Sequence, residues 1–245
     1  MALQLGSGAA VPSGVVTLAK VGKWPAVQEW LPVAGVSRND RAERARLRED
    51  VMMPSAELHP DVNRWRRGNL PKLRDQMGRI TAALDVWPLV FYGSLHLRVF
   101  KADGEVRNYG LASLGVVTTA GVNYIVADII GGANDSNLFK FHGIGTGTTA
   151  EAIGDTALVT ELTTQYQTDN TRPTGTQTTG GTSNVYRTVG TIVVDAAVSI
   201  AEHGVLTQAA TGGGTLLDRS QFTALPLASG DTLQAQYDLS LPAGG

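Results

Sequence analysis

The pattern of apolar and polar positions separates a strand-rich back part of the chain from a different front part. From Leu95 onward, short runs of alternating apolar and polar residues recur between glycine-rich turns. Such alternation predicts half-buried strands, and several short strands joined by turns are typical of a β-sandwich or jelly roll. Beyond an initial hairpin, we expect strands at residues 138–142, 163–168, 185–194, 198–202, 215–222 and 232–239. The predicted fold is mainly β, with a domain like a β-sandwich or jelly roll over residues 95–245.

This domain is expected to begin with a hairpin and one helix. Asp103-Gly104 lies between two alternating runs within residues 95–113, which is the strongest short-range hairpin signal. Thr118 or Thr119 can cap the helix that follows, and Gly131-Gly132 can end it. The apolar positions of this helix recur at helical spacing, at Val122, Ile125, Val126, Ile129 and Ile130. We expect the helix to lie across the sheet and to supply part of the core.

The stretch 138–162, LFKFHGIGTGTTAEAIGDTALVTEL, runs from an alternating strand into glycines at every second position. Gly143, Gly145 and Gly147 predict a bend where backbones approach closely. A dinucleotide site would need a strand, G-x-G-x-x-G and then a helix. Here the third glycine comes one residue early and no long amphipathic helix follows, so we expect no cofactor.

Residues 1–94 follow another pattern. Residues 1–36 are rich in Gly, Pro, Ala and Val, and the prolines after Trp24 and Leu31 favour extended backbone. We predict an extended N-terminal arm, laid over this domain or over a neighbouring subunit. Residues 37–94 are predicted to form short helices in a mixed-charge interaction region, one over residues 37–51 and a second beginning at Pro71.

Charge and aromatic residues are distributed unevenly along the chain. Residues 1–108 hold 16 Lys and Arg against 11 Asp and Glu, whereas residues 109–245 hold 4 against 11. All four tryptophans lie in the front part, and Trp and Arg are enriched in the centres of protein interfaces. Acidic residues interleave the basic ones without a nucleic-acid-reading motif, so a protein partner is favoured over nucleic acid. The contact residues that we expect are Trp24, Trp30, Trp65, Trp87, Arg64, Arg66 and Arg67.

No catalytic or metal-binding pattern accompanies these features. The chain has no cysteine, and its four histidines (His59, His96, His142 and His203) never occur at metal-ligand spacing. His142 alternates with Phe141 and could face solvent or a subunit contact, although a structural histidine is the simpler interpretation. The carboxylates are expected mostly at turns. The first residues lack a positively charged segment followed by an apolar one, so we expect no signal peptide, and no apolar run reaches the length of a membrane span. We expect a non-enzyme without metal or membrane contact.

Three runs carry a resemblance to a known class of proteins: VTTAGVNYIVADII (117–130), FKFHGIGTGTTAEAIGDTALVTEL (139–162) and YRTVGTIVVDAAVSIAEHGVLTQAATGGGTLLDRSQF (186–222). They resemble structural proteins of tailed bacteriophages, over more than half of the chain. The resemblance implies a virion component present in many copies and assembled in the host cytoplasm. It covers no part of residues 1–90.

Three functions remain open on this basis. The first is a capsid decoration, or cement, protein whose arm and basic helices clamp the major capsid protein, within a symmetric homo-oligomer. The second is a tail, baseplate or fibre component whose polar loops 169–183 and 210–214 contact host glycans, with Tyr166, Tyr186 and Tyr237 stacking on sugars. The third is a virion enzyme that degrades polysaccharide with paired carboxylates, for which no acid–base pair is identifiable.

Overall fold

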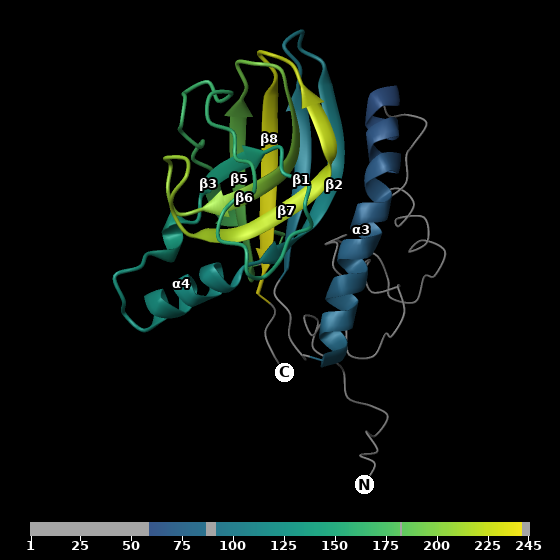
Figure 1. Ribbon diagram of the computed structural model, residues 1–245. Coiled ribbons are helices and arrows are strands. Elements are labelled where there is room, and N and C mark those ends of the chain that lie inside the picture. Colours follow the sequence, from purple (N-terminus) through teal and green to yellow (C-terminus); the bar gives the residue numbers. More distant parts are fainter. Residues whose placement is uncertain (1–58, 87–91, 182, 242–245) are drawn as a thin grey trace.

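The computed structural model describes residues 59–86, 92–181 and 183–241 (Figure 1). The helical elements are α3 (Pro60–Val86), α4 (Thr119–Ile129) and the short 3₁₀ helix η2 (Ser136–Leu138). The strands are β1 (Tyr92–Phe100), β2 (Val106–Val117), β3 (Phe141–Gly145), β4 (Thr176–Thr179), β5 (Val185–Val193), β6 (Val198–Leu206), β7 (Leu216–Leu227) and β8 (Thr232–Ser240). The predicted mainly β fold with one helix inside the strand-rich domain is confirmed. The predicted arm (residues 1–36) and the helix over residues 37–51 lie outside the described residues.

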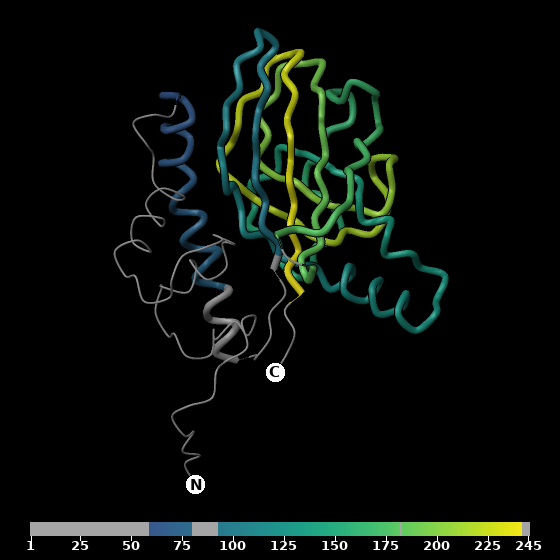
Figure 2. Tube along the Cα trace, turned by 180° about the vertical axis from the view of Figure 1, so that it is seen from behind, coloured from purple at the N-terminus to yellow at the C-terminus, as the bar shows by residue number. Residues whose placement is uncertain are grey.

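All eight strands belong to one antiparallel sheet, in the order β3-β6-β7-β2-β1-β8-β5-β4. The sheet curls until its two ends meet, because Phe141 of β3 bridges to Thr174, just before β4. The amide of His142 donates to the carbonyl of Pro173 (3.0 Å) at the same place. The two halves of the curled sheet therefore face each other like the layers of a sandwich, and Figure 2 shows the strands wrapped around a common interior.

The interior is apolar along most of its length. Inward-facing residues alternate along the strands, so both halves of the sheet contribute to one core. Its fully buried side chains include Leu95, Leu97 and Val99 of β1, Ile144 of β3, Ile192 of β5, Ile200 of β6, Phe222 and Leu225 of β7, and Leu233 of β8. The predicted hairpin is confirmed, because β1 and β2 pair from Phe100↔Val106 onward around Asp103-Gly104.

Strands β2 and β7 pair at only two positions, Val116↔Arg219 and Val117↔Asp218, and then separate. Extending that register would pair Leu114 with Gln221 and Ala112 with Thr223. In place of those pairs, side-chain amides from α3 connect the two strands. We call this opening between β2 and β7 the seam.

Asn69 and Gln76 fill the seam from one face of α3. Asn69 donates to the carbonyl of Ala112 (2.7 Å) and accepts from the amide of Thr223 (2.7 Å). Gln76 accepts from the amide of Leu114 (3.0 Å) and donates to the carbonyl of Gln221 (2.8 Å). Each side-chain amide thus bridges two backbone groups that would otherwise pair with each other across the strands. These backbone groups therefore stay hydrogen-bonded although the strands have separated. Val62, Leu73 and Met77 pack beside them.

The structure corrects the predicted start of the second helix. Helix α3 begins at Pro60 and contains Pro71 in its interior, where the ring is exposed. Proline is common in the first turn of a helix, but here further turns precede Pro71, and they bury Val62, Trp65 and Asn69. The helix is therefore one long element of 27 residues rather than a short one.

Two strand predictions also change. Residues 163–168 form no strand and make only the bridge Tyr166↔Val194, because side-chain contacts described below hold this segment. Within the predicted polar loop 169–183, residues Thr176–Thr179 form β4 against β5. The strand expected at residues 138–142 begins instead at Phe141 and continues through Gly143 and Gly145, since their missing side chains leave room for neighbours.

Helix α4 is where expected, but it contributes less to the core than predicted. The Thr118 side chain caps it by accepting from the amide of Gly121 (3.0 Å), as the sequence indicated. Val122 and Ile125 pack against a second cluster of buried residues, whereas Val126, Ile129 and Ile130 are exposed. That cluster comprises Val117, Phe139, Val205, Leu217, Tyr237 and Leu239. The helix extends away from the sheet at the base of the molecule (Figure 1) instead of crossing it.

We expect Asn69→Leu to lower the free energy of unfolding by about 2–4 kcal/mol. Leucine fills similar space but leaves the buried carbonyl of Ala112 and the part-buried amide of Thr223 without their partner, and each such group costs about 1–3 kcal/mol when water cannot reach it. Urea unfolding would measure the change. Asn123→Leu, at an exposed position of α4, is the control and should be nearly neutral. Equal stability of the Asn69 variant and the control would contradict the bridging role.

Candidate functional site

The polar residues of the folded chain form two kinds of candidate site, a set of buried ionic and histidine clusters inside and a charged helix face outside. The buried clusters fix the loops. Most of their members were expected at turns, yet Glu202, Asp218 and Arg219 are fully buried on β6 and β7.

Glu202 and Arg219 form a buried ion pair at 2.8 Å that fastens the loop 146–160. One Glu202 oxygen accepts from the amides of Gly147 (3.0 Å) and Thr160 (2.7 Å), and the other accepts from that of Val159 (3.0 Å). Arg219 also donates to Asp155 (3.0 Å). Every oxygen of Glu202 is therefore satisfied by backbone or by Arg219, which makes the cluster a structural clamp.

The glycines of the GIGTG run make room for this clamp. A Cβ atom on Gly145 would lie 2.4 Å from the carbonyl oxygen of Thr160, and one on Gly147 would lie 2.5 Å from Oε1 of Glu202. The predicted close approach of backbones is confirmed at Gly145.

A second ion pair joins Arg172 to Glu161 and organises the loops 161–172 and 208–213. Arg172 contacts both oxygens of Glu161, one at 2.8 Å, and donates to the carbonyls of Gln208 (2.8 Å) and Gly213 (2.9 Å). Glu161 in turn accepts from the amide of Gly212 (3.0 Å). The polar loops proposed to contact glycans are thus held together by one buried cation. Of the three tyrosines, Tyr166 and Tyr237 are buried and cannot stack on a sugar, which agrees with the alternative that core packing explains them, while Tyr186 is half-buried.

His142 and His203 meet inside the sheet, although they are far apart in the sequence. Nδ1 of His142 lies 2.9 Å from Nε2 of His203, and its Nε2 lies 3.0 Å from the hydroxyl of Thr188. The expectation that His142 faces solvent or a subunit is wrong, and the structural interpretation holds. Burial lowers the pKa of His142 to about 3 and that of His203 well below its ordinary value, so both rings are neutral.

Asp218 is a buried carboxyl that favours its protonated form. Burial raises its pKa to about 8, against the hydrogen bond that Ser220 donates to it (2.9 Å). Gly93 and Gly115 pack directly against this carboxyl, and a Cβ on either would come within 2.7 Å of its oxygens. No signal in the sequence distinguished Asp218 from carboxylates at turns.

The predicted interface residues separate into buried, exposed and undescribed groups. Trp65 is only 7% exposed and packs on Tyr109 and Phe222, while its indole donates to the carbonyl of Thr223 (2.8 Å). Its side chain is thus committed to the chain's own core rather than to a partner, because the helix buries its face against the seam. Trp24, Trp30 and Trp87 lie outside the described residues.

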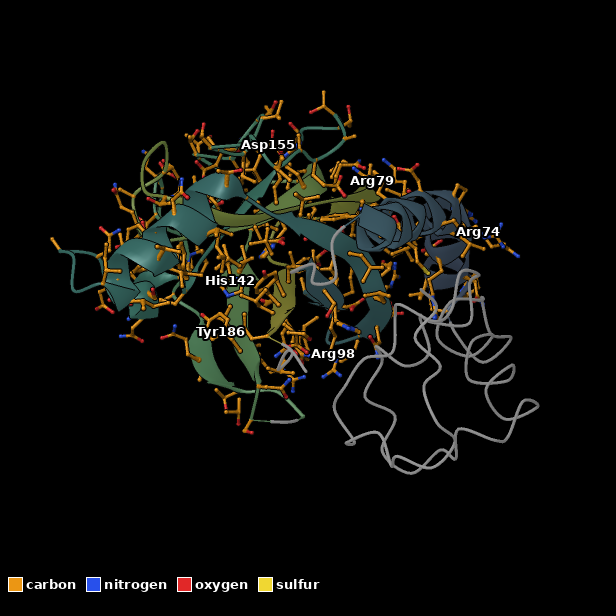
Figure 3. The ribbon with its side chains drawn as sticks, turned by 90° about the horizontal axis from the view of Figure 1, so that it is seen from below. Arg74, Arg79, Arg98, His142, Asp155 and Tyr186 are labelled. Carbon is orange, nitrogen blue, oxygen red and sulfur yellow. The ribbon has the colours of Figure 1, made fainter. Side chains whose placement is uncertain are left out.

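The arginines of α3 behave differently from Trp65. The Arg64 side chain is 79% exposed and Arg67 is exposed, whereas Arg66 is half-buried and burial lowers its pKa. Arg64, Arg67 and Arg74 recur at helical spacing opposite the buried face, and Figure 3 shows Arg74 projecting outward. We call Arg64, Arg67 and Arg74 the basic stripe. Arg74 was not among the predicted contacts, although its spacing from Arg67 could have revealed it.

Acidic residues border the basic stripe. Asp61 contacts Arg64 (3.4 Å) and Arg107 (3.1 Å), and Asp75 contacts Arg79 (3.3 Å). Arg79 turns inward instead and pairs with the buried Glu151 (2.9 Å), which helps to dock α3. The outer face of α3 therefore has mixed charge with a basic excess.

The described residues show neither a metal-binding group nor a membrane-spanning helix. They contain no group of three or more His, Asp or Glu side chains placed to hold a metal ion. Among the described helices, none is long and apolar enough to cross a membrane.

We expect the stability of the fold to pass through a maximum at about pH 6–7. Folded Asp218 keeps its proton up to about pH 8, whereas the unfolded carboxyl loses it near its ordinary pKa, so stability falls as pH rises. The histidines act oppositely: the unfolded chain binds protons below about pH 6.5 while folded His142 does not, so stability falls as pH decreases.

Asp218→Asn should remove the alkaline decline, which amounts to about 1 kcal/mol per pH unit near pH 7–8, and leave the acid decline in place. Unfolding free energies from urea titrations between pH 5 and 9 would test this. Parallel curves for the variant and the natural chain would show that Asp218 does not titrate as described.

Comparison of the chain with models of protein families, with curated protein sequences and with solved structures gives no significant match.

Proposed function

We propose that the protein is a structural component of a bacteriophage particle and decorates the capsid as a cement protein. The single observation that carries the proposal is the basic stripe, which a rigidly docked helix presents on the outside of a closed β body. The sequence resemblance of residues 117–222 to structural proteins of tailed phages supports the same class.

The docking of α3 explains why its outer face suits a partner. Its inner face is fixed to both strands of the seam by Asn69 and Gln76, and Arg79 binds the buried Glu151. The backbone of the stripe therefore keeps its orientation without a partner, and only the arginine side chains have to be ordered when one binds.

The neighbouring carboxylates favour protein over nucleic acid as the partner. Asp61 and Asp75 lie on the same helix as the stripe and would repel phosphates. An acidic protein surface with some basic residues would match this mixed pattern, as complementary interfaces commonly do. The major capsid protein is the partner that we propose.

Charge reversal of the stripe should reduce binding to the particle. The triple variant Arg64→Glu, Arg67→Glu and Arg74→Glu is added to particles that were assembled without this chain. We expect its affinity for these particles to be at least about 30-fold lower, which corresponds to a hot-spot loss of about 2 kcal/mol. Occupancy can be measured by sedimenting particles with added protein.

The matched control is Arg98→Glu, because Arg98 is exposed on β1 and lies apart from Arg74 (Figure 3). Each single stripe variant is compared with this control, and thermal unfolding verifies that the variants are folded. Full occupancy by a folded triple variant would refute the stripe as the binding surface.

Removal of residues 1–36 should also reduce occupancy while the body stays folded. This segment holds Trp24 and Trp30, and its loss removes two large aromatic side chains that favour interfaces. Circular dichroism would verify the β fold, and the sedimentation assay would measure binding. Unchanged occupancy would eliminate the arm from the proposed attachment.

A further inference from the structure

We infer that residues 1–36 of one copy bind the exposed apolar face of α4 on a second copy, in a head-to-tail arrangement. The inference deepens the proposed function, because it names how neighbouring copies are linked on a particle. The binding surface consists of Val126, Ile129 and Ile130, which we call the α4 patch.

The α4 patch consists of three exposed apolar side chains at the end of one short helix. Ile129 and Ile130 are 77% and 78% exposed, and Val126 is 50% exposed. The one charged residue of α4, Asp128, accepts a hydrogen bond from the amide of Ser136 (3.0 Å) and so serves the turn into η2. The patch has the 3,4 spacing by which apolar helix faces are recognised.

Residues 1–36 are a chemical match for this uncharged surface. They carry only three charged residues, Lys20, Lys23 and Glu29, and they include Trp24 and Trp30 among many Val, Ala and Leu residues. The patch offers no charge that would attract a charged partner. Apolar and aromatic side chains, in contrast, would be buried against it favourably.

The two segments join the body at opposite ends, an arrangement that allows contact between copies. Helix α3 begins beside the β1–β2 hairpin, where His59 lies 3.5 Å from Glu105 and Asp61 lies 3.1 Å from Arg107. Residues before His59 therefore join the body at its hairpin end. Helix α4 starts at the other end of β2, and the ribbon shows α3 and α4 on different flanks (Figure 1).

Strand β2 has 12 residues, so the two ends are about 40 Å apart. Residues 37–59 can extend up to about 75 Å, which lets residues 1–36 reach the base of an adjoining copy. The α4 patch lies at one end of the body, and residues 1–36 join it at the other end. Binding between them is a heterologous contact, which closes into rings or continues as a chain of copies.

The test uses purified full-length chains without particles, so its failure is distinguishable from failure of the capsid proposal. The patch variant, Ile129→Asp with Ile130→Asp, disrupts the α4 patch. The arm variant, Trp24→Ala with Trp30→Ala, removes the two tryptophans of residues 1–36. Thr163→Asp with Thr164→Asp is the matched control, because both threonines are exposed neighbours and the added charge is the same. Circular dichroism and thermal unfolding establish that all variants are folded.

In analytical ultracentrifugation, we expect the natural chain and the control to associate, and each of the other two variants to be monomeric, with association weakened at least about 30-fold. In an equimolar mixture of the patch variant and the arm variant, the intact residues 1–36 of the first can bind the intact α4 patch of the second. The mixture should therefore form one-to-one pairs and nothing larger. A monomeric natural chain, association of either variant alone, or a mixture that stays monomeric would overturn the inference.

Discussion

The separation of β2 from β7 after two residue pairs is the constraint on which the rest of the structure depends. A curled antiparallel sheet that opens there would leave buried amide and carbonyl groups without partners, which is costly. Asn69 and Gln76 satisfy those groups in the register that the strands would have kept. Because both residues lie on one face of α3, the same bonds fix the rotation of the helix. The outward direction of Arg64, Arg67 and Arg74 is therefore a consequence of how the sheet is closed.

Buried charge has a comparable role on the other side of β7. Glu202 would carry a severe desolvation penalty on its own, but three loop amides and Arg219 satisfy it, so the loop 146–160 has a single arrangement. Arg172 does the same for two further loops through Glu161. Removing one member of such a pair typically costs about 3–5 kcal/mol because the other is left buried and uncompensated. These buried charges therefore serve to hold the loops, which are fixed by side-chain contacts rather than by strand pairing.

The sequence was informative where local chemistry decides the structure. The Asp103-Gly104 turn, the Thr118 cap and most strands follow from short-range patterns, and the structure has them. The histidine pair, the protonated Asp218 and the α3 bridges could not be predicted, because each joins residues more than 30 positions apart through the curl of the sheet. The exposed side of α4 was missed for a related reason: its spacing indicates an apolar face without indicating what covers that face. Trp65 shows the same limit, since a tryptophan suited to an interface is equally suited to a core.

The distribution of polar groups also bears on what the protein does. The described histidines and carboxyls with strongly shifted pKa values, His142, His203 and Asp218, are fully buried, so their perturbation reflects packing. Perturbed pKa values mark functional sites when the groups line an accessible cleft, and these groups lie between the two halves of the sheet. The exposed features on which the two proposals rest are instead an apolar helix end and a basic helix face on different flanks. If both proposals hold, the two surfaces bind a shell and a neighbouring copy at once, and the combined contacts give an avidity that neither surface has alone.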